Sequence, residues 1–247
     1  MNKFLAKLFP SKSKKNQQDE ALLPYKQVFQ DKIGLEIGGP SQIFTDQTFP
    51  LYEWAQKIDG CNFSNNTIWE GAINTDEYRY LPNKSGHQYI LEGSELKGIE
   101  DNEYDFLLSS HNLEHIANPL KAVKEWIRIL KPGGYMLLIL PDKRFTFDHK
   151  RPDTSFAHLL SDLELNTGED DLTHLSEILE LHDLSLDHGA GDYESFKKRS
   201  ENNFEVRGLH QHVFSQALLK ECLEYFDLKV QLQHFVAPYH QIIIAQK

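Results

Sequence analysis

Residues 104–141 constrain the fold more than any other part of the chain, because they predict a complete strand–helix–strand unit. The apolar stretch at 104–109, Y-D-F-L-L-S, predicts a buried strand. Asn118 and the proline after it form a typical helix start, and apolar residues then recur at helical spacing. K-P-G-G at 131–134 ends this helix, and a second apolar stretch follows at 135–140. Two parallel strands joined by a right-handed helical crossover indicate an α/β fold.

A glycine turn after an earlier predicted strand offers a place for a ligand. Residues 33–37, I-G-L-E-I, form a short apolar run that ends at Gly38 and Gly39, where the backbone can turn sharply. Glu36 lies at the carboxyl end of this strand, where open α/β sheets bind their ligands. The turn lacks the G-x-G-x-x-G spacing of a dinucleotide site, which favours a ligand without a pyrophosphate. An ordinary strand-to-helix turn is the alternative.

An acidic residue follows at the spacing typical of a nucleoside site. Residues 55–63 predict a second strand, and Asp59 within it lies 23 residues after Glu36. In nucleoside-binding α/β folds, an acid near this separation accepts hydrogen bonds from the ribose hydroxyls. Glu70 is the competing candidate, and the spacing favours Asp59. A solvated loop acid is the alternative for either residue.

A third predicted strand, at residues 88–91, ends at another acid, Glu92, which can meet an adenine edge. The polar, tyrosine-rich residues 71–86 before it predict a loop with at most one short helix. The carboxyl ends of parallel strands meet at the same edge of a sheet. We therefore expect Glu36, Asp59 and Glu92 to converge on one nucleoside-shaped hollow.

The composition excludes some classes of protein. A net charge of −11 argues against nucleic acid as a partner, because phosphate binding needs clustered Lys and Arg. Two cysteines, Cys61 and Cys222, are too few for a disulfide framework and suit a reducing cytoplasm. No apolar run approaches the length of a transmembrane helix.

The first residues differ from the remainder of the chain. Residues 1–15 contain five lysines and no acid, and four apolar residues there can line one side of a short helix. We interpret residues 1–18 as a basic, flexible lead. Contact of this lead with an anionic membrane surface is the less favoured alternative.

Three stretches together resemble class I S-adenosylmethionine-dependent methyltransferases of the type 11 group. They are L-E-I-G-G at 35–39, Y-D-F-L-L-S-S-H-N-L-E-H at 104–115 and L-K-P-G-G-Y-M-L-L-I-L-P at 130–141. The resemblance implies a Rossmann-like, seven-stranded and mostly parallel sheet of order 3-2-1-4-5-7-6, with the last strand antiparallel. The predicted helix at 216–226 and the two strands after it suit that ending. The chain departs from the family at Pro40, where a further glycine is usual.

The resemblance also implies S-adenosylmethionine as the cofactor and gives each motif a role. The implied cofactor-binding residues are Glu36, Gly38, Gly39, Asp59, Glu92, Gly93, Ser110, His111 and His115. In this assignment Glu36 orients the methionyl part through the glycine turn, and Gly38 and Gly39 let the backbone pass close to the cofactor. Asp59 takes the ribose hydroxyls, and Glu92 and Gly93 flank the adenine. Ser110 and His111 lie beside the sulfonium and the incoming acceptor, and His115 lies one helical turn further on.

Residues 142–208 have no place in the minimal fold and are too many for a loop in a compact domain. We interpret them as a cap over the acceptor pocket, inserted in a methyltransferase domain at 19–247. The cap is rich in histidine and in charge, which favours acceptor binding and proton transfer by a His–Asp pair. His111 and His149 are the candidate catalytic bases.

We expect no metal site. His210 and His212 are two residues apart and would share one strand face near His182 or Asp183, but this spacing resembles no standard zinc pattern. Polar surface and structural hydrogen bonds account for most of the twelve histidines.

The predicted function is transfer of a methyl group to an oxygen or nitrogen of a small polar acceptor. A sugar or glycan precursor is one candidate, by analogy with the family. A binding or scaffold protein that uses the cofactor fold without turnover is the main alternative. A nicotinamide enzyme is a third, and the missing dinucleotide fingerprint counts against it.

Overall fold

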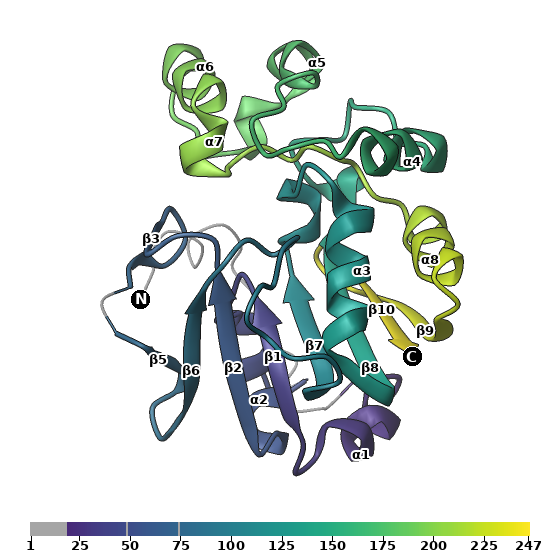
Figure 1. Cartoon of the computed structure of the whole chain (residues 1–247). Helices are drawn as coiled ribbons and strands as arrows, with labels where there is room; N and C mark the ends of the chain where they lie inside the picture. The colour runs from purple at the N-terminus through teal and green to yellow at the C-terminus, as the bar shows by residue number, and fades with distance from the viewer. Residues whose placement is uncertain (1–18, 48, 74) are drawn as a thin grey trace.

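The computed structural model describes residues 19–47, 49–73 and 75–247, so the predicted basic lead at 1–18 lies outside the described residues. An eight-stranded sheet forms the centre of the molecule (Figure 1). Its strands are β1 (Ile33–Ile37), β2 (Lys57–Asn62), β5 (Glu77–Leu81), β6 (Lys84–Ile90), β7 (Tyr104–Ser110), β8 (Leu130–Pro141), β9 (Lys229–Val236) and β10 (His240–Gln246). A separate two-stranded ribbon consists of β3 (Asn66–Thr67) and β4 (Gly71–Ala72).

The described helices are α1 (Lys26–Phe29), α2 (Leu51–Trp54), α3 (Pro119–Ile129), α4 (Phe156–Leu165), α5 (Leu175–Leu181), α6 (Tyr193–Glu201), α7 (Asn203–Val206) and α8 (Gln216–Tyr225). The start of α3 is as predicted: the Asn118 side chain accepts a hydrogen bond from the backbone N–H of Lys121, and Pro119 occupies the first turn. Among the described residues, none of these helices is long and apolar enough to cross a membrane.

The strand order is β5-β6-β2-β1-β7-β8-β10-β9. From β6 to β8 all neighbours are parallel, while β10 runs antiparallel to both β8 and β9. Seven of the strands therefore have the predicted order and the predicted antiparallel ending. The eighth, β5, corrects the prediction of a loop at 71–86. It pairs antiparallel with β6 and alternates buried tyrosines, Tyr78 and Tyr80, with exposed charged residues, the two-residue period of a strand.

The two faces of the sheet are covered in different ways. On one face lie α3 and α8, whose buried side chains include Trp126 and Leu219. On the other face the covering segments are short, and aromatic rings supply the apolar contacts. Phe29, Phe49 and Tyr52 are among them, and each is wholly buried. Large rings bury much area per residue, so short helices suffice here.

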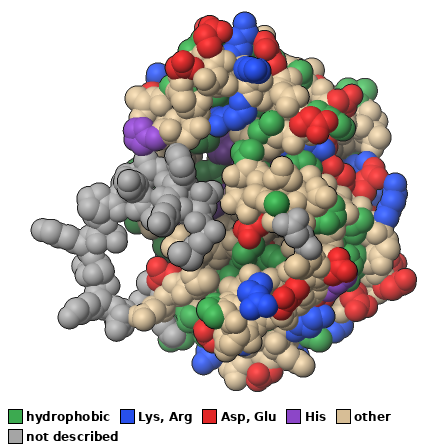
Figure 2. Space-filling model, turned by 90° about the vertical axis from the view of Figure 1, so that its left-hand side faces the viewer, with side chains coloured by type: hydrophobic (Ala, Val, Ile, Leu, Met, Phe, Trp, Pro, Cys, Tyr) green, Lys and Arg blue, Asp and Glu red, His purple; other side chains and the backbone are tan. Residues whose placement is uncertain are grey.

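Helices α4 to α7 lie beyond the ends toward which the parallel strands point (Figure 1). Residues 142–208 thus stand over the edge of the sheet where α/β proteins bind ligands. They contain a small apolar core of their own, formed by Ile178, Ala190 and Phe196 with Leu209. On the described part of the face seen in Figure 2, basic and acidic side chains are interspersed rather than gathered into separate patches.

Candidate functional site

A narrow pocket opens at the carboxyl ends of β1, β2, β6 and β7. The strands β1 and β7 are neighbours, but the chain continues from β1 to one side of the sheet and from β7 to the other. Ligands of this kind of sheet usually bind at such a point. The sheet side of the pocket is lined by Gly38, Asn62, Glu92, Gly93, Asn112 and His115, and the cap side by Glu169 and Arg207. The cavity volume is about 30 Å³, far below the roughly 300–1,000 Å³ of typical ligand pockets.

The glycine turn forms one wall of this pocket. Gly38 has a φ of +81°, and a Cβ there would lie 2.5 Å from Asn112 Nδ2. A Cβ on Gly39 would lie 2.1 Å from the hydroxyl oxygen of Tyr78. Both positions therefore need glycine, the first for its backbone conformation and the second for lack of space. The Oδ1 of Asn112 is buried without a hydrogen-bond partner among the described residues, so this acceptor is available to a ligand.

Glu36 lies beneath the turn rather than in the pocket. Its Oε1 accepts a hydrogen bond from Ser41 Oγ at 2.6 Å, and its Oε2 accepts from the hydroxyls of Tyr52 at 2.6 Å and Tyr78 at 2.7 Å. Burial raises the pKa of Glu36, and these three hydrogen bonds offset part of the rise. Glu36 thus fixes residues 38–41 from below, and any effect on a ligand passes through the turn.

Asp59 lies inside β2, three residues before its end, and does not line the pocket. Its Oδ1 accepts from the backbone N–H of His87 at 2.6 Å and pairs with Lys57, and its Oδ2 accepts from the Tyr104 hydroxyl at 3.0 Å. Both oxygens are thus used in joining β2 to β6 and, across β1, to β7. The expected convergence of three strand-end carboxylates is wrong, because among Glu36, Asp59 and Glu92 only the last lines the pocket.

Asn62 occupies the end of β2 and was missed by the sequence reasoning. Its Nδ2 donates to the Gly39 carbonyl at 3.2 Å, and its Oδ1 accepts from Trp69 Nε1 at 3.2 Å. The side chain is buried and lines the pocket. A search for carboxylates alone passes over such an amide. The competing acid, Glu70, is exposed on the segment between β3 and β4 and does not line the pocket.

A salt bridge joins the cap and the sheet at one wall of the pocket. Arg207 donates to both oxygens of Glu92, at 2.8 and 3.1 Å, and its guanidinium also pairs with Glu169 at 3.1 Å. The guanidinium stacks 4.8 Å from the ring centroid of Phe63. Burial raises the pKa of Glu169 to about 7, although Arg207 opposes the rise. We call this triad of Glu92, Glu169 and Arg207 the latch.

The latch predicts how stability depends on pH. The pKa of Glu169 is about 7 in the folded chain against an ordinary 4.5. The folded state therefore holds a proton that the unfolded state has lost, and Glu169 makes the fold less stable as pH rises from 4.5 to 7. As the pH rises through this interval, we expect the free energy of unfolding of Glu169→Gln to increase relative to that of wild type, by at most about 3 kcal/mol. Urea denaturation at pH 5 and pH 8 measures it. Glu205→Gln, an exposed change on α7, is the control, and a parallel pH response of both variants would contradict the assignment.

A second group of polar residues surrounds the end of β7. His111 has a φ of +51°, and its Nε2 lies 2.8 Å from Nδ1 of His240 on β10. Its Nδ1 lies 3.7 Å from Glu114 Oε1. Glu114 is 1% exposed, and neither of its oxygens has a hydrogen-bond partner among the described residues. Burial raises the pKa of Glu114, but the neighbouring histidines outweigh burial, so that the pKa lies below its usual range.

Two more histidines complete this group, which we call the Glu114 cluster. His115 Nδ1 lies 2.9 Å from the Leu209 carbonyl, and burial lowers the His115 pKa to about 4. His210 pairs through Nδ1 with Asp148. Burial lowers the His210 pKa, but Asp148 outweighs it and the pKa is raised. The cluster therefore offers one neutral and one readily protonated imidazole beside a buried carboxylate.

The remaining predicted residues are spread more widely. Gly93 lines the pocket, and its carbonyl accepts from Trp126 Nε1 at 2.8 Å. Ser110 ends β7 beside Ile139 of β8 and does not line the pocket. His149 lies in the cap, where its Nε2 pairs with Asp183 at 2.9 Å. Of the two candidate bases, only His111 therefore lies in the Glu114 cluster.

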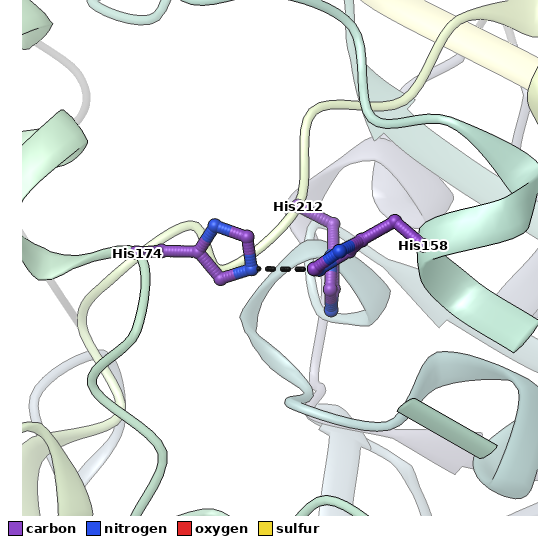
Figure 3. A group of neighbouring side chains, drawn as sticks. All are labelled: His158, His174 and His212. Carbon is purple, nitrogen blue, oxygen red and sulfur yellow. Dashed lines mark hydrogen bonds between the residues drawn. The ribbon is translucent and has the colours of Figure 1, made fainter. Parts of the chain in front are cut away.

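His210 and His212 do not share a strand face, as the disfavoured metal-site alternative required. Residues 209–213 form no strand, and the two side chains enter different clusters. His210 belongs to the Glu114 cluster. His212 instead meets His158 and His174, as Figure 3 shows. Burial lowers the pKa of His212 to about 3, so this imidazole is neutral at ordinary pH.

Comparison with known sequences supports the family resemblance. A family model described as a methyltransferase domain matches residues 46–138, less than half of the chain. The match runs from before α2 into β8 and includes β2, β6, β7 and α3. No curated protein matches the chain in sequence.

Solved structures share the fold. A S-adenosylmethionine dependent methyltransferase from Mesorhizobium loti has a TM-score of 0.53 at 11% identity, covering 92% of this chain and 98% of that one. A SAM dependent methyltransferase from Aquifex aeolicus has a TM-score of 0.50 at 15% identity, covering 91% and 87%. A putative methyltransferase from Bacillus halodurans has a TM-score of 0.50 at 11% identity, covering 91% and 95%. Identities this low show the fold alone. With the family model, they confirm the predicted resemblance to class I S-adenosylmethionine-dependent methyltransferases.

Proposed function

We propose that the chain binds S-adenosylmethionine in the pocket and transfers its methyl group to an oxygen or nitrogen of a small polar acceptor. The observation that carries this proposal is the position of the pocket, beside a glycine turn and at the point where the connections after the neighbouring strands β1 and β7 leave in opposite directions. The residues fit the cofactor: the turn leaves space at Gly38, and the orphaned Asn112 Oδ1 can accept from an ammonium group. Glu92 and Glu169 bring acidic side chains to the pocket, where both pair with Arg207 in this structure.

The pocket suggests where each part of the cofactor lies. In this proposal Gly38 and Asn112 contact the methionyl part, and Asn62, at the end of β2, meets the ribose hydroxyls; all three line the pocket. Glu92 and Gly93 lie beside the adenine. This assignment keeps the predicted roles of Gly38, Glu92 and Gly93 and moves the ribose contact from Asp59 to Asn62.

The Glu114 cluster is the proposed acceptor site. Bound S-adenosylmethionine would supply the methyl group from its sulfonium. His111 would accept the proton that the acceptor O–H or N–H loses, and Glu114 would stabilise the imidazolium formed. Holding acceptor and methyl in line supplies much of such catalysis, up to about 7–11 kcal/mol in model systems. The surrounding histidines and carboxylates suit a hydroxyl-rich acceptor, and a sugar or glycan precursor is our candidate.

The narrow cavity predicts that the latch must open before the cofactor enters. A closed state reduces apparent affinity by the fraction of molecules that are open. Removing the guanidinium in Arg207→Ala should therefore raise the association rate constant for S-adenosylmethionine, by at least about threefold. Stopped-flow tryptophan fluorescence measures it, since Trp69 lines the pocket.

The matched control for this rate is Arg199→Ala, because Arg199 is a cap arginine that pairs with Asp187 away from the pocket. We expect this variant to bind at the wild-type rate. An Arg207→Ala association rate at or below that of wild type would show that the latch does not gate entry.

Isothermal titration with S-adenosylmethionine and with S-adenosylhomocysteine tests the proposed function at its first step. Saturable binding is expected with one site per chain. No heat of binding at millimolar ligand would remove the proposal. The scaffold alternative draws support from the closed latch, and it predicts that binding occurs without turnover in a methyl-transfer assay across hydroxyl and amine acceptors.

A further inference from the structure

Three histidines converge on one point, two of them from separate parts of the cap and the third from the segment that follows the cap. His158 lies on α4, His174 just before α5, and His212 in the extended segment that leaves the cap. One ring nitrogen from each lies within 4.8 Å of the other two. The Nε2 atoms of His158 and His174 are 3.0 Å apart, and Figure 3 shows the rings approaching from three directions.

The buried member of this group is oriented as a ligand. His212 is 1% exposed, and its Nε2 lies 3.1 Å from the Ala117 carbonyl, which can only accept a hydrogen bond. The proton must therefore be on Nε2, and Nδ1 carries the lone pair. That Nδ1 is buried and has no hydrogen-bond partner among the described residues. Metal-bound histidines typically donate their other ring N–H to a backbone carbonyl in this way.

A carboxylate borders the three rings. Asp162 Oδ2 lies 3.3 Å from His158 Nε2 and 3.8 Å from His212 Nε2, and it too is buried without a hydrogen-bond partner in the described part of the chain. The other oxygen accepts from Thr167 Oγ1 at 3.2 Å. The backbone of Asp162 is held as well, because its carbonyl accepts from Asn118 Nδ2 at 2.7 Å. The orphaned oxygen is therefore fixed in place rather than free to turn to solvent.

We propose that His158, His174 and His212, with Asp162 beside them, bind one divalent transition-metal ion, for which Zn²⁺ is the best match. Imidazole nitrogens with a carboxylate are a donor set typical of zinc. A tetrahedral site with metal–nitrogen bonds near 2.0–2.1 Å places its ligand atoms about 3.3 Å apart. The 3.0 and 3.3 Å separations around His158 are close to that value. The ion also accounts for two buried polar atoms that otherwise lack partners.

The position of the site gives it a structural role. His174 follows the segment that carries Glu169, one member of the latch, and Glu169 accepts from the backbone N–H of Ala117. His212 contacts the carbonyl of the same Ala117. A metal would thus connect α4, the segment that carries Glu169 and the segment that carries His212 beside the edge of the pocket. It would fix the position of the cap relative to the sheet without touching the reacting atoms.

Zinc titration of the metal-free full chain tests the proposal. The chain is stripped with a chelator, and Zn²⁺ is added in competition with a chromophoric indicator. Wild type should bind one ion per chain. His174→Ala and His158→Ala should each bind at least about 100-fold more weakly, since loss of a ligand exceeds the roughly 10–100-fold effect of outer contacts. Both positions are partly exposed, so these variants should fold, which far-UV circular dichroism verifies.

Two control variants sharpen the test. His188→Ala removes an exposed cap histidine outside the group and should bind Zn²⁺ as wild type does. His115→Ala removes a member of the Glu114 cluster, which also has ligand-like spacing. Zinc binding that is lost in His115→Ala but kept in His174→Ala would overturn the proposal, as would wild type with no binding tighter than about 10 µM. Binding of S-adenosylhomocysteine is measured in a separate titration. A failure to bind zinc would therefore not contradict the proposed function.

Discussion

Replacing Glu36 by alanine is expected to weaken cofactor binding at least tenfold and to lower the free energy of unfolding by roughly 2–4 kcal/mol. The change leaves the hydroxyls of Ser41, Tyr52 and Tyr78 without their acceptor, and both tyrosines are buried. Buried donors without partners are costly, and residues 38–41 lose the group that fixes them. Urea denaturation measures the stability, and isothermal titration with S-adenosylhomocysteine measures the affinity.

Two milder variants separate the causes. Glu36→Gln keeps one acceptor oxygen and should lie between wild type and Glu36→Ala in both measurements. Tyr52→Phe removes two hydrogen bonds, the one donated to Glu36 Oε2 and the one accepted from the Ser41 backbone N–H, but keeps the carboxylate and its other two donors. It should cost about 1–2 kcal/mol and lose less affinity than Glu36→Ala. If Glu36→Ala loses stability but binds within twofold of wild type, the turn does not depend on Glu36 for its ligand geometry.

Gly38→Ala should weaken cofactor binding at least tenfold, although the variant should still fold. The φ of +81° strains any other residue, by roughly 1–2 kcal/mol. The added methyl would also lie 2.5 Å from Asn112 Nδ2 and push that side chain into the pocket. The same titration and denaturation measure both effects.

Gly98 provides a matched control for Gly38. Its φ is +92°, so alanine suffers a similar backbone strain, yet no heavy atom lies within 4 Å of the added Cβ. Gly98→Ala should therefore lose similar stability and keep full affinity. Equal losses of affinity in both variants would mean that binding reports general destabilisation rather than the shape of the pocket.

Much of the fold could be predicted from the sequence because its signals are local. The strand–helix–strand unit at 104–141 has clear apolar runs, a capped helix start and a P-G-G stop, and the structure has these elements where they were expected. Strand β5 was missed because its outward residues are charged, and an alternating strand shows less apolar character than a buried one. The helices α1 and α2, on the sheet face that aromatic rings cover, are too short to give a periodic pattern of apolar residues.

The site was only partly predictable, because its contacts join distant segments. Gly38, Glu92, Gly93 and His115 line the pocket as expected. Spacing alone placed the ribose acid at Asp59, but the strand continues three residues further, and the pocket-facing residue is an amide. Arg207 lies 115 residues after Glu92, and no local sequence pattern predicts that two residues so far apart form a salt bridge.

A crystal structure with S-adenosylhomocysteine tests the central claim most directly. The account predicts the nucleoside between Gly38, Asn62 and Glu92, with Arg207 moved away from Glu92 and the sulfur facing the Glu114 cluster. A ligand bound elsewhere on the chain, or a latch that stays closed over the pocket at saturating ligand, would contradict it.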